Sequence, residues 1–102
     1  MPGRVKIGAK VLSIQRKKLP SKYFGRIDCR LGTIEIGLKM HEGQVRDTLL
    51  HEVMHGCLFQ LGVDGEKDLT VEEFIVLLAP SLLAVMYDNP ELVAYLTEEE
   101  VV

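Results

Sequence analysis

The spacing of the apolar residues changes near residue 43, and this change limits the fold more than any other feature of the sequence. Before it, apolar and polar side chains alternate loosely, with Val5, Ile7, Ala9 and Val11 on one side, and a period of two is typical of β-strands. After it, apolar residues recur every three or four positions, as in a helix that buries one side. Strands followed by helices, rather than alternating with them, indicate an α+β fold.

The sequence predicts a β-sheet region over residues 1–40, made of one strand and one hairpin. The strand covers residues 5–15. The hairpin joins two runs, 23–30 and 33–37, through a turn at Gly32, where we expect a positive φ. We therefore expect a short antiparallel sheet at the beginning of a single domain, residues 1–102, because domains commonly hold about 100–150 residues.

Three helices are expected after the sheet, at residues 43–62, 70–88 and 89–97. In the second helix, Thr70 and Glu73 have the spacing of a capping box. Its apolar run, Phe74 to Tyr87, covers 14 residues, whereas a membrane span needs about 20. The sequence therefore predicts a buried core helix here and no membrane span.

Charge and cysteine content bear on partners and location. Residues 1–50 carry 11 Lys/Arg and 4 Asp/Glu (+7), whereas residues 51–102 carry 1 and 11 (−10). The basic half is either a contact face for acidic protein or nucleic acid, or it simply attracts the acidic half. Cys29 and Cys57 are too few for a disulfide framework and no signal peptide is visible, so we expect a cytoplasmic protein.

The first predicted helix contains the sequence His51-Glu52-Val53-Met54-His55. Residues four apart lie on one side of a helix, so both imidazoles can bind one zinc ion. Glu52, next to the first histidine, can accept a hydrogen bond from a water on that ion. The motif therefore predicts a zinc site, with His51 and His55 as ligands and Glu52 as general base.

Catalytic zinc commonly has a third protein ligand. The downstream candidates are Asp64, Glu66, Asp68, Glu72 and Glu73. We favour Glu72, because the capping box engages Glu73 and a returning antiparallel helix brings its first turns toward the histidines. The alternative is that Glu72 only stabilises the helix N-terminus.

A transition-state stabiliser is less clearly marked. Tyr87, Tyr95 and His41 are the candidates, and a plain solvent-exposed residue is the alternative for His41. Cys57 is expected to be a buried core thiol.

The motif and its surroundings resemble a known family. Leu49 to Gly56 resembles the active-site helix of zincin metallopeptidases, and the later glutamate is similar to the gluzincin pattern. The order of segments over roughly residues 23–96 also resembles short zincin-like proteins encoded by bacteriophages and prophages. The segments that carry this second resemblance are 48–55, 72–73, 79–85 and 88–92.

The resemblance implies a metallopeptidase with zinc bound by His51, His55 and Glu72 and with Glu52 as general base. It also implies that a peptide binds as an added strand at the sheet edge next to the motif helix. The alternative is a non-catalytic protein-binding module, a host-interaction or regulatory factor whose metal is structural or absent. We do not expect nucleic acid as a partner, because no stacking or helix-turn-helix signature accompanies the basic residues.

Overall fold

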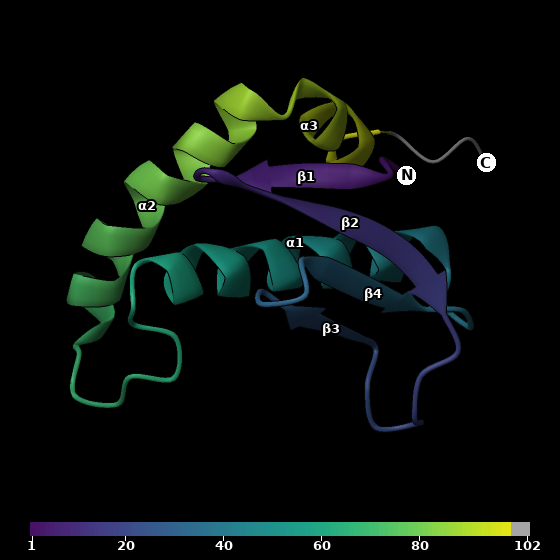
Figure 1. Ribbon diagram of the computed structural model, residues 1–102, viewed down its shortest axis with the longest axis horizontal. Helices are drawn as coiled ribbons and strands as arrows, with labels where there is room; N and C mark the ends of the chain where they lie inside the picture. Colours follow the sequence, from purple (N-terminus) through teal and green to yellow (C-terminus); the bar gives the residue numbers. More distant parts are fainter. Residues whose placement is uncertain (99–102) are drawn as a thin grey trace.

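The computed structural model describes residues 1–98 and contains a four-stranded sheet followed by three helices (Figure 1). This arrangement confirms the α+β prediction, and each predicted helix begins and ends within two residues of an observed one. The elements are β1 (Arg4–Ile7), β2 (Lys10–Lys17), β3 (Gly25–Asp28), β4 (Thr33–Gly37), α1 (Glu42–Gln60), α2 (Val71–Asp88) and α3 (Pro90–Leu96).

The sheet differs from the prediction in two ways. The expected single strand over residues 5–15 is the hairpin β1–β2, which turns at Gly8 with φ 61°. Apolar residues alternate in the sequence through the turn, so the period alone does not reveal it. In the structure the buried positions change phase, from Val5 and Ile7 in β1 to Leu12 and Ile14 in β2, and Val11, expected on the side of Val5 and Ile7, is exposed. The strand order is β1-β2-β4-β3, and β2 runs parallel to β4, which makes the sheet mixed rather than antiparallel. The predicted hairpin β3–β4 is present, and Gly32 has φ 76°.

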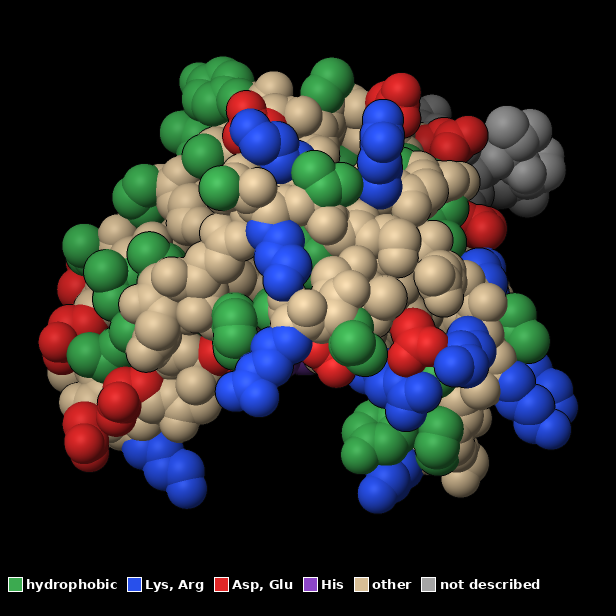
Figure 2. Space-filling model, in the orientation of Figure 1, with side chains coloured by type: hydrophobic (Ala, Val, Ile, Leu, Met, Phe, Trp, Pro, Cys, Tyr) green, Lys and Arg blue, Asp and Glu red, His purple; other side chains and the backbone are tan. Residues whose placement is uncertain are grey.

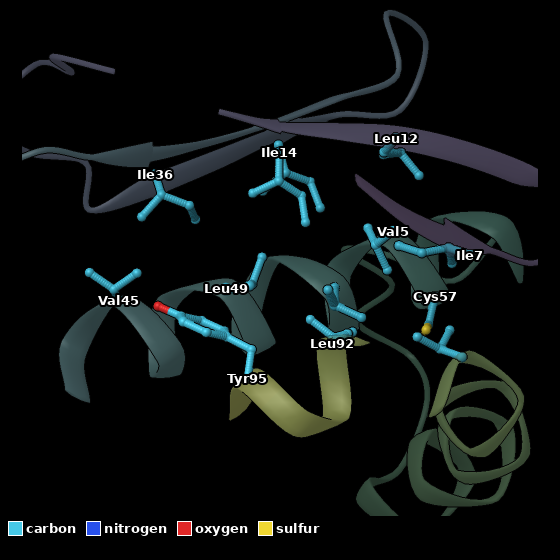
Figure 3. Close-up of a cluster of buried hydrophobic side chains, with 13 residues drawn as sticks. Val5, Ile7, Leu12, Ile14, Ile36, Val45, Leu49, Cys57, Leu92 and Tyr95 are labelled. Atoms are coloured by element: carbon cyan, nitrogen blue, oxygen red, sulfur yellow. The ribbon is translucent and has the colours of Figure 1, made fainter. Parts of the chain in front are cut away.

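Helix α1 packs across one face of the sheet, and α3 packs against α1 (Figure 1). In Figure 3, Leu49 of α1 lies between the sheet residues Ile14 and Ile36 and the α3 residues Leu92 and Tyr95. All five belong to one cluster of buried side chains. The core thus holds α1, and with it the histidine motif, between the sheet and the C-terminal helix.

A glycine sets how closely α1 approaches the sheet. A Cβ atom added at Gly56 would lie 2.7 Å from Cδ1 of Ile7 and 3.1 Å from Cδ1 of Ile27. The first distance is shorter than a van der Waals contact, so a side chain here would force either the Ile7 side chain or the helix to shift. Gly56 follows His55 directly. Because Gly56 has no side chain, the histidine motif can lie close to β3.

Helix α2 is less buried than the prediction of a core helix requires. Only Val85 is buried, while Leu78 and Leu82 are half-buried against the core. These three positions share one side of the helix, and the opposite side is also apolar but faces solvent. The exposed apolar side chains of α2 are Val71, Ile75, Val76, Leu83, Met86 and Tyr87. No helix within residues 1–98 is long and apolar enough to cross a membrane.

Tyr95 joins α3 to the beginning of α1, and this contact predicts how stability changes with pH. Its hydroxyl donates a hydrogen bond to Glu42 at 2.7 Å. Burial, together with the Glu42 carboxylate, raises the pKa of Tyr95 to about 12. Because this folded-state pKa lies above the usual value of about 10, the contribution is complete below pH 10 and is lost as the pH rises through about 12.

We therefore expect Tyr95→Phe to lower the free energy of unfolding by about 1.5–3 kcal/mol at neutral pH, as for other hydrogen bonds to charged groups. Urea unfolding of both proteins between pH 7 and pH 12 measures the difference. It should shrink between pH 10 and pH 12, because the unfolded chain loses the tyrosine proton near pH 10 whereas folded Tyr95 keeps it until about pH 12. A difference that stays constant up to pH 12 would contradict this assignment.

Candidate metal centre

His51 and His55 lie one turn apart on α1, and their side chains point toward one another. The two Nε2 atoms are 3.1 Å apart. Two nitrogens that bind one tetrahedral zinc ion at about 2.0–2.1 Å lie about 3.3 Å from each other. The observed pair is within a few tenths of an ångström of that separation, so the two imidazoles fit a single zinc ion.

Asp64 contacts His55 through the ring nitrogen that does not face His51. Its Oδ1 atom lies 2.8 Å from Nδ1 of His55. A carboxylate at Nδ1 favours the tautomer in which that nitrogen carries the proton, which leaves the lone pair on Nε2. Asp64 thus orients His55 with its Nε2 atom toward His51. The sequence offered Asp64 only as a candidate ligand, because its position depends on the loop between α1 and α2.

Glu52 is buried beside the two histidines, with 7% of its surface exposed. Burial raises the pKa of the Glu52 carboxyl, Asp64 acts in the same direction, and His51 and His55 act against it. The carboxylate lies close to the beginning of β3, because a Cβ atom added at Gly25 would come within 3.4 Å of Oε2 of Glu52.

Gly25 is a site residue that sequence reasoning missed. A side chain there would also lie 2.7 Å from Cγ2 of Thr48, a buried residue of α1. The absence of a side chain lets β3 pass close to Glu52. A single glycine at the first position of a strand gives no signal of this kind, because the close approach exists only after the helix has packed on the sheet.

A cavity of about 200 Å³ opens beside Glu52 and His51, between α1 and the beginning of β3. A molecule bound in this cavity can therefore contact both side chains. We name it the motif pocket. Its lining residues are Lys22, Tyr23, Phe24, Gly25, Asp47, Thr48, His51 and Glu52.

The third ligand is not assembled with the histidine pair. Among residues 1–98, no group of three His, Cys, Asp or Glu side chains lies close enough together to hold a metal ion. Glu72 is exposed in the first turn of α2, and so are Ile75 and Val76, beside which we expected it to turn inward. The inward side of α2 carries Leu78, Leu82 and Val85, roughly a third of a turn away from Glu72. Glu72 as a ligand stays a prediction.

Two of the other acidic candidates, Glu73 and Glu66, have local partners. Thr70 and Glu73 form the predicted capping box, with both hydrogen bonds at 3.1 Å. Glu66 accepts hydrogen bonds from the backbone N–H groups of Lys67 and Asp68 in its own loop. Asp64 is therefore the candidate that contacts a motif histidine in the structure.

The candidates for transition-state stabilisation have other positions. His41 caps α1, its Nδ1 accepting a hydrogen bond from the Gln44 N–H at 3.3 Å. Tyr95 is bonded to Glu42, and Tyr87 is 78% exposed on α2. Cys57 is buried, as predicted.

The charges of the molecule are separated around this site. Figure 2 shows acidic side chains gathered over the beginning of α2 and basic side chains gathered around the loop between β2 and β3. The candidate metal centre lies on α1, which runs between these two regions (Figure 1). A bound molecule therefore meets a basic environment on one side and an acidic one on the other.

Comparisons with family models, with curated proteins and with solved structures found no match.

Proposed function

We propose that this protein is a zinc-dependent peptidase in which His51 and His55 hold the metal and Glu52 is the general base. The observation that carries the proposal is the pair of Nε2 atoms 3.1 Å apart, with a buried carboxylate beside them. Two further features support it. Asp64 orients His55, and the motif pocket gives access to Glu52.

The edge of the sheet next to the site has the form that binds an extended peptide. In the described part of the chain, β3 pairs with β4 and leaves its other side unpaired. The Phe24 carbonyl accepts a hydrogen bond from the Gly37 N–H at 2.8 Å, and bonded positions alternate along an antiparallel pair. Gly25 and Ile27 therefore direct their N–H and C=O groups outward. A peptide added as a strand at this edge lies beside Glu52.

Each site residue then has a defined role. Zinc, when bound, would supply a Lewis acid that polarises the peptide carbonyl and lowers the pKa of water to near 7. Glu52 takes the proton from the attacking water and returns it to the amine that leaves. Asp64 keeps the His55 ring in place during both steps. Glu72 remains our proposed third ligand and would have to move inward from its exposed position.

The alternative is a protein-binding module that keeps this scaffold without catalysis. The observation that favours it is that no third ligand stands beside the histidines within residues 1–98. In that case the metal is structural or absent, and the unpaired edge of β3 serves only to bind a peptide. For both functions we propose a cytoplasmic location, in the host cell if the protein is phage-encoded, and a protein or peptide as the partner.

Zinc content tests the metal part of the proposal. We expect the wild-type protein to bind one zinc ion, as measured by elemental analysis and by competition with a chromophoric chelator. His55→Ala should lose the ion, because a single imidazole remains. Asp64→Asn should weaken zinc binding by about 10–100-fold, the usual effect of removing a carboxylate that orients a ligand.

Asp68→Asn is the matched control, because it makes the same change in the same loop at a residue that does not contact a histidine in the described structure. Its zinc affinity should equal that of the wild type. If His55→Ala keeps the affinity of the wild type, the histidine pair is not the metal site. Loss of affinity in Asp68→Asn but not in Asp64→Asn would reverse the assignment of the loop residues.

A further inference from the structure

A second and larger pocket lies next to the motif pocket. Its volume is about 550 Å³, and it is formed by the loop between β2 and β3 together with the connection from β4 to α1. Tyr23 and Phe24 line both pockets, so the two are adjacent. We name the larger one the loop pocket. Its lining residues are Lys18, Leu19, Pro20, Ser21, Tyr23, Phe24, Gly37, Leu38, Lys39 and Met40.

The walls of the loop pocket are apolar and its charged groups are cationic. Leu19, Phe24, Leu38 and Met40 supply aliphatic and aromatic surface. Phe24 is 61% exposed and Leu38 53% exposed, so both offer apolar surface to a bound group. No carboxylate lines the pocket in the described part of the chain. The loop pocket is therefore suited to bind an apolar group that carries a negative charge next to it.

The cations around the pocket differ in whether they are already neutralised. Lys17 and Arg26 both contact Glu35, at 3.1 Å and 2.6 Å. Lys18 and Lys39 make no ion pair with any of residues 1–98 in the structure. These two lysines are therefore the groups that can attract an anionic partner to this pocket.

Arg16 gives the wall of the pocket a fixed shape. Its guanidinium donates hydrogen bonds to the Gly37 carbonyl at 2.9 Å and to the Leu38 carbonyl at 3.1 Å. These bonds tie the connection after β4 to the end of β2, next to Phe24, whose carbonyl accepts a hydrogen bond from the Gly37 N–H. Leu38 is thereby held at the rim although its side chain is half exposed.

We propose that the loop pocket binds an apolar side chain of a peptide whose neighbouring residues are Asp or Glu. This inference rests on the proposed binding of a peptide at the β3 edge. Phe24 precedes β3 directly and forms a wall of both pockets, so a strand that leaves the motif pocket along this edge reaches the loop pocket next. The apolar side chain enters the pocket, and the acidic neighbours face Lys18 and Lys39.

Single-stranded nucleic acid is the competing occupant, because lysines next to aromatic rings also bind stacked bases. The structure favours the peptide for two reasons. The Lys22 ammonium lies 5.1 Å from the centre of the Tyr23 ring and covers one of its faces. The remaining walls include Leu19, Leu38 and Met40, which offer hydrocarbon rather than groups that read a base edge.

The test is fluorescence anisotropy with the full chain and three labelled peptides, measured in the presence of a chelator. The parent peptide has one phenylalanine flanked by two aspartates on each side. One altered peptide replaces the phenylalanine by alanine, and the other replaces the aspartates by lysines. We expect the parent to bind at least about tenfold more tightly than either, because each change removes one of the two recognised features.

Protein variants locate the binding. Lys18→Glu combined with Lys39→Glu should weaken parent binding about tenfold, whereas Lys10→Glu combined with Lys67→Glu changes the net charge equally and should leave it within twofold. Leu38→Ser should weaken binding, and Leu83→Ser, a residue of similar exposure on α2, should not. Equal binding of the three peptides, or equal effects of the paired variants, would overturn the inference. So would displacement of the parent by an oligothymidylate at lower concentration than by unlabelled parent.

The design separates this inference from the proposed catalysis, because the chelator removes any need for zinc. A binding preference for the parent peptide without cleavage under any metal condition supports the loop pocket and contradicts the peptidase. Cleavage of all three peptides at the same rate supports the peptidase and contradicts binding at the loop pocket.

Discussion

Replacing Glu52 by Gln is expected to lower the rate of peptide cleavage by about 10²- to 10⁴-fold, the usual contribution of a general base. The amide has nearly the same shape as the carboxylate but cannot accept the proton from water. The two histidines are unchanged, so zinc should remain bound in the same amount. The measurement is the initial rate of hydrolysis of a quenched fluorescent peptide, with zinc determined in the same sample.

Glu91→Gln is the matched control, because it makes the same chemical change at an exposed residue of α3. It should retain the activity of the wild type. Thermal unfolding of both variants shows whether the buried substitution has altered the fold. Full activity in a folded, zinc-loaded Glu52→Gln protein would remove Glu52 from the mechanism and leave the peptidase proposal without a base.

The largest expected effect on stability is that of Leu49→Ala. Leu49 is fully buried between the sheet and α3, directly before Leu50 and His51 on α1 (Figure 3). Truncating a leucine in such a position costs about 2–5 kcal/mol, since the removed methyl groups leave a cavity. This is a large share of the about 5–15 kcal/mol that stabilises a typical domain. Urea unfolding followed by circular dichroism measures the loss.

Leu50→Ala serves as the comparison, because it makes the same change in helix propensity at the neighbouring residue, which is only half-buried. We expect it to cost about 1 kcal/mol. The difference between the two variants isolates the burial of Leu49. If both variants lose the same free energy of unfolding, the burial of Leu49 does not anchor α1 between the sheet and α3.

Much of the fold could be predicted because it depends on local patterns. The apolar spacing of α1, the capping box of Thr70 and Glu73 and the turn at Gly32 are each contained in a short segment, and all three are observed. The mixed sheet depends on which distant strands meet. The pairing of β2 with β4 joins residues about 20 positions apart, and nothing in either strand specifies its direction.

The candidate site likewise has one part that a short segment of sequence predicts and another that depends on contacts between distant segments. His51 and His55 share a helix, so their spacing alone brings the two rings together. Asp64 reaches His55 only through the path of a loop, and Gly25 approaches Glu52 only after β3 has packed on α1. The position of Glu72 relative to the histidines depends on the angle between two helices, which the sequence of neither helix determines.

The separation of acidic and basic side chains described for Figure 2 gives this face of the molecule an electric dipole moment across the motif pocket. In dilute buffer such a moment turns an approaching charged chain before the two molecules touch, so that its negative end faces the loop between β2 and β3. At physiological ionic strength the field decays over about 8 Å, which is short beside the 40 Å length of the molecule. The direction in which a chain enters the motif pocket is then decided by contact rather than by long-range attraction.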